Sequence, residues 1–234
     1  MGFRPTFWAT VVFVPVFLLL IGLGTWQVQR LEWKNNLIDT RMERIAAPAL
    51  NLAAARNAPS PDAIEYRPIT LSGLLRNDRQ FRLLNRIYDG TQGAHLVVPM
   101  ELDDGLGTIM IDRGWIPRGS VADLPDEAAQ RVVLNGFVRA YREPGAFLPE
   151  NEPAANNWFY MDEAEMLAAA GLSGGLGFYV EAGPDSNSPG TFPVGAVPDV
   201  NLPNNHLQYA GTWYGVAGVL LVIFIVFHWR RERS

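Results

Sequence analysis

The fold is decided by one stretch, NNHLQYAGTWYGVAGVLLVIFIVFHWRRERS, which occupies residues 204–234. No Asp, Glu, Lys or Arg occurs from Val200 to Trp229, and a helix over most of this run crosses a hydrocarbon core of about 30 Å. Three arginines follow directly, and the positive-inside bias places such a cluster in the cytoplasm. We therefore predict a transmembrane helix over residues 206–229 and a cytoplasmic basic tail over residues 230–234.

This helix is predicted to have two different faces. At about 100° per residue, His206, Tyr209 and Trp213 share one face, whereas Gly211 and Gly215 lie on roughly the opposite face. Glycines at this spacing let another helix backbone approach closely, so we expect the glycine face to pack against the chain's other apolar segment. The aromatic face has two interpretations, an aromatic belt at the membrane interface or a binding site.

The other apolar segment is uncharged from Pro5 to Gln29. It resembles an uncleaved signal anchor, because it is too long for the core of a signal peptide. We predict a span over residues 7–28 that follows a cytoplasmic stretch of residues 1–6. Pro15 is expected to kink this helix or to leave one carbonyl in need of another partner.

After the apolar segment, Trp26, Arg30 and Trp33 recur at helical spacing, which predicts that the helix continues to about Ala46. Arg30 lies between the two tryptophans, and two interpretations stand. It makes a cation–π contact within an interfacial anchor, or it presents a cation to an anionic ligand at the membrane surface.

Two spans place both termini on one side of the membrane and residues 29–205 on the other. The orientation signals conflict, because basic residues after the first span favour one topology and the basic tail favours the reverse. We follow the tail, since acidic residues are interspersed with the first basic group. No Arg- and Ser-rich leader precedes the first helix, so we expect a bacterial inner membrane, cytoplasmic termini and a periplasmic main domain.

The composition argues against several function classes. A net charge of −5 without a basic stripe argues against a nucleic-acid partner. The absence of cysteine excludes disulfides and thiolate metal sites. The sequence has no phosphate loop, dinucleotide fingerprint or histidine pair at metal-ligand spacing, and the elbow-like GLSGG at residues 171–175 follows a helix pattern instead of joining a strand to a helix. We therefore expect a protein that is not an enzyme.

Between the spans the pattern is mostly that of β-strands. Period-two alternation predicts strands over residues 66–75, 80–88, 94–102, 108–117, 131–141 and 177–182, with a short strand inside NWFYMD at residues 157–162. Asn77 and Asp78 resemble a hairpin turn between the first two strands, and DDGLG at residues 103–107 resembles the turn of a second pair.

Helix signals in this region are few. Asp162 as N-cap, Glu165 at the capping-box position and Gly171 as C-cap predict one short helix. The run from Pro48 to Asp62 is expected to be a connector, and residues 183–205 a linker. We expect an α+β fold, in which two transmembrane helices bracket a mainly antiparallel β domain, a small barrel or sandwich.

Six segments, in chain order, resemble the Surfeit locus protein 1 family. They are LGTWQVQRLEWK (Leu23–Lys34), YRPITLSG (Tyr66–Gly73), IDRGWIP (Ile111–Pro117), LNGFVR (Leu134–Arg139), NNWFYMD (Asn156–Asp162) and NNHLQYAGTWYG (Asn204–Gly215). The resemblance implies a membrane protein that acts in the assembly of haem–copper cytochrome c oxidase, on the catalytic subunit. It implies haem a as a ligand, and haem a synthase is a further candidate partner beside the lipid bilayer.

The resemblance also implies roles for single residues. His206 matches the family's haem-associated histidine, which makes it the candidate ligand to the haem iron, and Trp213 matches its tryptophan partner. Trp26, Gln27 and Arg30 match the signature of the first helix. The chain departs from the family at residues 92–100, where Ala94 replaces a commoner aromatic and leaves the role of His95 open.

The residue types agree with a haem site. Haem needs an axial imidazole, an aromatic wall and cations for its propionates, and these are supplied by His206, by Trp213 with Tyr209, and by Arg30 with Lys34. Our preferred hypothesis is a non-enzymatic protein that holds or relays haem a. The competing hypothesis is a scaffold that stabilises the nascent oxidase subunit and carries no haem. Of the other histidines, His95 is expected to be a satisfied structural residue and His228 to extend towards the cytoplasmic arginines.

Overall fold

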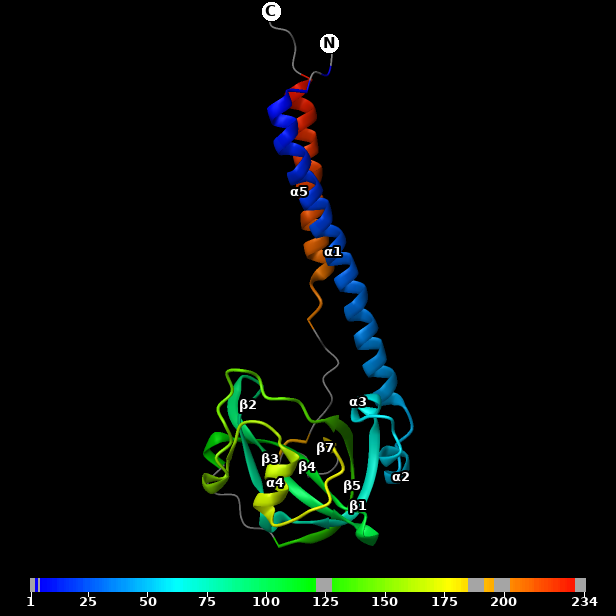
Figure 1. Cartoon of the computed structure of the whole chain (residues 1–234), viewed down its shortest axis with the longest axis vertical. Coiled ribbons are helices and arrows are strands. Elements are labelled where there is room, and N and C mark those ends of the chain that lie inside the picture. The colour runs from blue at the N-terminus through cyan, green and yellow to red at the C-terminus, as the bar shows by residue number, and fades with distance from the viewer. Residues whose placement is uncertain (1–2, 4, 121–127, 185–191, 196–202, 230–234) are drawn as a thin grey trace, which may run out of the picture. The chain divides into compact units, whose positions relative to one another are not determined.

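The computed structural model describes residues 3, 5–120, 128–184, 192–195 and 203–229 (Figure 1). The chain divides into two compact units. Residues 1–40 and 200–234 form the helical unit, and residues 41–199 form the barrel domain. Each unit is described separately.

Two long helices lie side by side in the helical unit (Figure 1). The helix α1, Phe7–Ala46, continues through Pro15 and ends where the sequence pattern predicts. The helix α5, His206–His228, is closed by Trp229 as its C-cap. Both are long and apolar enough to cross a membrane, and most of their apolar side chains are exposed, which indicates a membrane protein.

The face of α5 that contacts α1 is not the predicted one. Ala210 and Ala217 are buried, with 2% and 1% of their surface exposed. A Cβ atom added to Gly211, Gly215 or Gly218 would have no neighbour within 4 Å. The prediction that Gly211 and Gly215 seat the first helix is therefore wrong. The polar groups of α5 explain the outcome, because they find partners on α1, and an unpartnered polar group in hydrocarbon is costly.

The barrel domain is built on a seven-stranded mixed sheet in the order β1-β5-β7-β4-β3-β2-β6. The strands are β1 (Pro68–Leu75), β2 (Phe81–Tyr88), β3 (Thr91–Leu102), β4 (Thr108–Pro117), β5 (Gln130–Ala140), β6 (Asn157–Trp158) and β7 (Phe178–Ala182). A further antiparallel pairing joins β1 to the end of β3, so the strands β1, β5, β7, β4 and β3 form a closed ring. The predicted small barrel is confirmed, with parallel pairing at β4–β7 and β2–β6.

Alternate residues of the strands belong to two apolar clusters. One cluster takes residues from all five strands of the ring, Ile111 and Val180 among them. The other lies on the opposite face, where α4 (Glu163–Ala170) packs with Met166 against Met110 and Trp158. Neighbouring residues of β4 thus face different clusters, which is why this strand is buried on both faces.

The ends of α4 agree with the sequence. The carboxylate of Asp162 accepts a hydrogen bond from the backbone N–H of Glu165 at 2.9 Å, and Gly171 closes the helix in the left-handed conformation, with φ of 68°. Two further helices were not predicted, α2 (Leu52–Arg56) and α3 (Pro61–Ile64). The helix α2 lies in the predicted connector and α3 begins at its end, and helices of five and four residues are too short to show a period.

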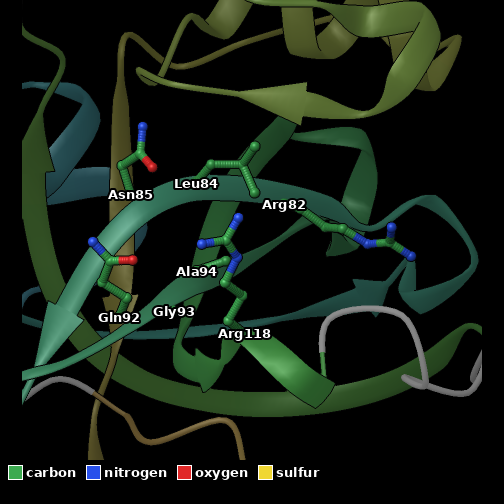
Figure 2. Close-up of a pocket in the computed structure, with 7 residues that line it drawn as sticks. All are labelled: Arg82, Leu84, Asn85, Gln92, Gly93, Ala94 and Arg118. Carbon is green, nitrogen blue, oxygen red and sulfur yellow. The ribbon is translucent and has the colours of Figure 1, made fainter.

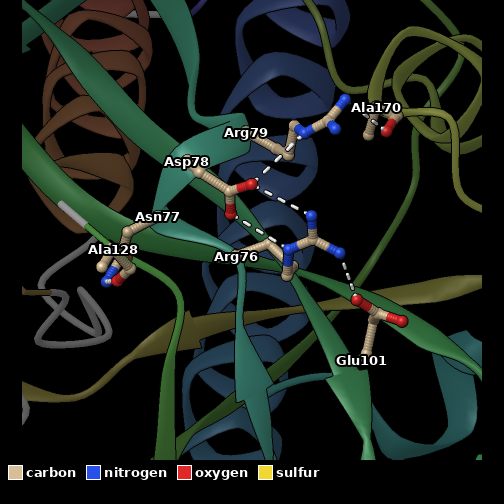
Figure 3. Close-up of polar contacts among 7 residues, drawn as sticks. All are labelled: Arg76, Asn77, Asp78, Arg79, Glu101, Ala128 and Ala170. Atoms are coloured by element: carbon tan, nitrogen blue, oxygen red, sulfur yellow. Dashed lines mark hydrogen bonds and ion pairs between the residues drawn. The ribbon is translucent and has the colours of Figure 1, made fainter. Parts of the chain in front are cut away.

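The first predicted hairpin is wrong, because β1 and β2 do not pair. Asn77–Arg79 is a 3-10 turn that leads the chain from the ring to its extension. Figure 3 shows how this turn is held. Arg76 binds Asp78 at 3.0 Å and Glu101 of β3 at 2.5 Å, while Arg79 donates to the carbonyl of Ala170. The hydrogen bond from Arg76 lowers the pKa of Asp78 to about 2.

The tight hairpin joins β2 and β3 instead. Its two turn residues, Asp89 and Gly90, have φ of 46° and 72°, as a type I′ turn requires. The predicted pair of β3 and β4 is confirmed, with Gly105 and Gly107 in the left-handed region of the turn. Asp-Gly is the stronger hairpin signal of the two, and this dipeptide could have identified β2–β3 from the sequence.

Candidate functional site

The candidate site begins at the first residue of α5. His206 Nδ1 lies 2.7 Å from Oε1 of Gln27 on α1. An amide oxygen only accepts, so Nδ1 carries a proton and donates it. In the neutral imidazole the lone pair is then on Nε2, the nitrogen that can bind a metal ion. The structure thus brings together two of the residues that the sequence analysis proposed separately.

The aromatic candidates lie on the same side of α5 as His206. Tyr209 and Trp213 follow His206 at helical spacing; Trp213 is half-buried and Tyr209 is 55% exposed. Trp26, next to Gln27 on α1, is also exposed. These rings provide apolar surface beside the imidazole, and much of that surface is open to a ligand.

Arg30 and Lys34 have different environments. The guanidinium of Arg30 lies over the ring of Trp33, 3.9 Å from its centre, so the predicted cation–π contact is confirmed for this tryptophan. Arg30 is exposed, and its N–H groups remain available for an anion. Lys34 donates to the carbonyl of Pro203, and Asn204 donates to Oδ1 of Asn35 at 2.8 Å. Lys34 therefore helps to hold the start of α5 against α1.

A second polar pair was missed by the sequence analysis. The hydroxyl groups of Tyr214 and Thr25 lie 3.1 Å apart, and the ring of Tyr214 covers Gly24, which is buried. The signal that could have revealed this contact is the adjacent Gly24-Thr25, since a small residue next to a hydroxyl accommodates a large polar ring.

The other end of α5 carries His228, which is 5% exposed. Its Nδ1 donates to the carbonyl of Phe224 at 2.8 Å, and Nε2 lies 3.1 Å from the hydroxyl of Thr6. The rings of Phe3, Phe224 and Phe227 surround it. The expectation that His228 extends towards the arginines is therefore wrong, because both of its nitrogens have partners inside the helix pair.

His95 in the barrel domain is a satisfied residue, as expected. Its Nδ1 lies 2.7 Å from Oδ2 of the buried Asp112, whose Oδ1 accepts from the N–H of Gly114 at 2.9 Å. In the part of the chain that the structure describes, no group of three or more His, Cys, Asp or Glu side chains is arranged to hold a metal ion. Among the described residues, His206 differs from His228 in that only its Nδ1 has a protein partner, which is Gln27.

Buried charges flank the His95–Asp112 pair. Glu181 of β7 is paired with Arg139 at 3.6 Å, and Arg139 is equally close to Glu65. Burial raises the pKa of Glu181 above its ordinary value, although Arg139 opposes the shift. A raised carboxyl pKa in the folded state predicts that the stability of the domain falls as the pH rises above 4.5.

The fold and the site define a class of membrane protein in which two apolar helices bracket a closed mixed β-barrel. Comparison with known proteins agrees. The model of the SURF1 family matches residues 14–218, a range that holds every proposed site residue. The chain belongs to the SURF1 family, which confirms the resemblance seen in the sequence.

Individual relatives are similar over most of their length. Surfeit locus protein 1 of Mus musculus is 34% identical over 226 residues, which are 87% of this chain and 72% of the mouse protein. Its counterpart in Homo sapiens is 35% identical over 214 residues, 84% and 69% of the two chains. A SURF1-like protein of Monosiga brevicollis is 29% identical over 233 residues, 94% and 86% of the two chains.

Proposed function

We propose that this protein is a non-enzymatic assembly factor for haem–copper cytochrome c oxidase that holds haem a, or relays it, for the catalytic subunit. In this proposal His206 would bind the haem iron through Nε2. The observation that carries it is the hydrogen bond between His206 Nδ1 and Gln27 Oε1 at 2.7 Å. Histidines that bind metals commonly donate their other ring N–H to such a partner, which fixes the tautomer and the orientation of the ring.

The residues around His206 fit the chemical needs of haem. Trp213, Tyr209 and Trp26 supply apolar aromatic surface at the start of an apolar helix. Arg30 supplies an exposed cation for a propionate, and its stacking on Trp33 leaves the edge of the guanidinium free to donate. Haem a would supply the redox-active iron when bound, and these side chains would hold it and orient it.

The proposal includes a place in the cell. We propose the bacterial inner membrane, with both termini in the cytoplasm and the barrel domain in the periplasm. The basic residues after α5 support this orientation. The catalytic subunit of the oxidase is the proposed recipient, and haem a synthase is the proposed donor.

A second function is favoured by a different observation. Gly211, Gly215 and Gly218 leave an open small-residue surface on α5, away from α1. A helix of the nascent oxidase subunit could pack there. In that case the protein acts as a haem-free scaffold.

The absorption spectrum of the full chain, purified in detergent from cells that make haem a, distinguishes the two functions. His206→Ala should abolish or strongly shift the haem absorption at near-normal protein yield. The matched control is His228→Ala, which removes a buried histidine whose nitrogens are both occupied and should leave the haem spectrum unchanged. A wild-type spectrum of His206→Ala, combined with failed oxidase assembly, would refute the ligand role and favour the scaffold.

A further inference from the structure

A pocket of about 280 Å³ lies on the barrel domain, outside the helical unit and the proposed haem site. Figure 2 shows it between β2, β3 and the turn that follows β4. Leu84 and Ala94 form part of an apolar wall, and Asn85 and Gln92 present side-chain amides. The pocket is smaller than the roughly 300–1,000 Å³ of pockets for drug-sized molecules, so it suits a compact ligand.

The charged groups of this pocket are both positive. Arg82 and Arg118 line it, and no acidic residue is among the described residues of the lining. This is unusual in a chain whose net charge is −5. Carboxylates pair with other arginines of the domain, as Asp103 does with Arg131 and Glu181 with Arg139.

These two arginines also differ from the other arginines of the domain in their contacts. Among its described residues, every other arginine contacts a carboxylate, a carbonyl, an amide or an aromatic ring. Arg82 and Arg118 have no such partner there. The Nε atom of Arg82 is buried without an acceptor, as it is in Arg41, Arg67 and Arg139, but those three arginines have other partners. A buried donor without an acceptor is unfavourable, and an oxyanion would satisfy it.

The two arginines lie in different positions in the pocket. In Figure 2 the guanidinium of Arg118 lies in the middle of the pocket and points towards Leu84, whereas the side chain of Arg82 extends to one side. Asn85 adopts φ of 58°, at the register shift between Leu83 and Arg86, and this distortion of β2 brings its amide to the lining. An anion in the pocket would therefore meet Arg118 first, with Arg82 as the second positive charge.

We propose that this pocket binds the oxyanion group, carboxylate or phosphate, of a compact ligand, through Arg118 and with Arg82 in support. Guanidinium groups bind both kinds of oxyanion with two parallel N–H···O bonds. The amides of Asn85 and Gln92 add neutral donors, and Leu84 contacts the remainder of the ligand. The site is independent of haem binding.

Calorimetric titration of the detergent-purified full chain tests this proposal, with inorganic phosphate and succinate as probes at low ionic strength. Saturable binding of at least one probe is expected. Tighter binding of phosphate identifies a phosphate group as the natural ligand's anion, and tighter binding of succinate identifies a carboxylate. Arg118→Gln should weaken binding at least tenfold, and Arg82→Gln by a smaller factor. Arg118 is exposed, so Arg118→Gln should leave thermal unfolding unchanged.

The matched control is Arg131→Gln, which removes the same charge from an exposed position outside the pocket. It should change the affinity by less than twofold. Two results would overturn the proposal. One is the absence of saturable binding for both probes. The other is an equal loss in Arg131→Gln and Arg118→Gln, since that reports the overall charge of the domain and not a site.

Discussion

The ring of Tyr214 lies against Gly24 so closely that a Cβ atom added to the glycine would be 2.7 Å from Cε1 of the ring. The hydroxyl of the same tyrosine lies 3.1 Å from Oγ1 of Thr25. The close approach sets the distance between the two helices, and the polar contact sets their register. Gln27 with His206 is a second such contact in the same helix pair.

Gly24→Ala is expected to destabilise the helix pair, because the new methyl group forces the tyrosine ring away. Ala is the better helix former by about 1 kcal/mol, so a loss of stability would report the contact and not the propensity. Thermal unfolding of the detergent-purified chain measures it. Gly215→Ala is the control, since its added Cβ has no neighbour within 4 Å, and it should be neutral or stabilising. Equal losses in both variants would contradict the assigned packing face.

Gln27→Leu should weaken haem retention by about 10- to 100-fold, the range typical of lost partners of metal-bound histidines. The leucine removes the acceptor for His206 Nδ1 and keeps a similar volume. Haem loss to an apo-globin acceptor measures the retention. The control is Gln208→Leu, an exposed glutamine of α5, which should behave as the wild type. Retention equal to that of the wild type would show that Gln27 does not support the ligand.

A topology reporter fused after Ser234 is expected to behave as cytoplasmic, because of the arginines that follow α5. A second reporter belongs between Ala58 and Ser60, in the gap between α2 and α3, where it interrupts neither helix. That reporter should behave as periplasmic. The opposite pair of results would reverse the proposed orientation and place His206 at the cytoplasmic face.

Glu181→Gln should stabilise the barrel domain at neutral and alkaline pH. Burial raises the pKa of this carboxyl from its ordinary 4.5, so the folded state disfavours the ionised form. The penalty is absent below pH 4.5 and appears as the pH rises through the raised folded-state pKa. Arg139 keeps Glu65 as a partner in the variant.

The difference in melting temperature between Glu181→Gln and the wild type should therefore grow as the pH rises above 4.5 and level off above the raised folded-state pKa of Glu181. Each kcal/mol corresponds to about 2–4 °C in a domain of this size. Glu143→Gln, at an exposed position, removes the same charge and should show no such trend. A variant less stable than the wild type at pH 8 would show that the ion pair with Arg139 outweighs the cost of burial.

Local signals predicted the local structure well. Period-two alternation located the strands of the ring, and Asp162 and Gly171 marked both ends of α4. Strand neighbours were harder, because β1 pairs with β5 and β3 across long separations that no local pattern records. The prediction of which face of α5 packs against α1 was also wrong. Ala210 and Ala217 are small enough for a close approach, as the glycines are, and only the partners on α1 decide which face packs.

For the candidate site, the sequence predicted single residues but not the contacts between them. Motif match named both His206 and Gln27, but the contact between them depends on how the two helices are aligned. Tyr214 and Thr25 were missed because each looks ordinary until it is placed opposite the other.

The position of β7 has a consequence for biosynthesis. This strand lies between β5 and β4, both of which precede it in the chain. As the protein leaves the ribosome, the edges of β4 and β5 therefore stay unpaired until residues 178–182 have emerged, shortly before the second apolar helix. Unpaired strand edges are the usual templates for aggregation. The nascent chain is thus most vulnerable during the synthesis of the segment between β5 and β7, and a delay there favours misassembly.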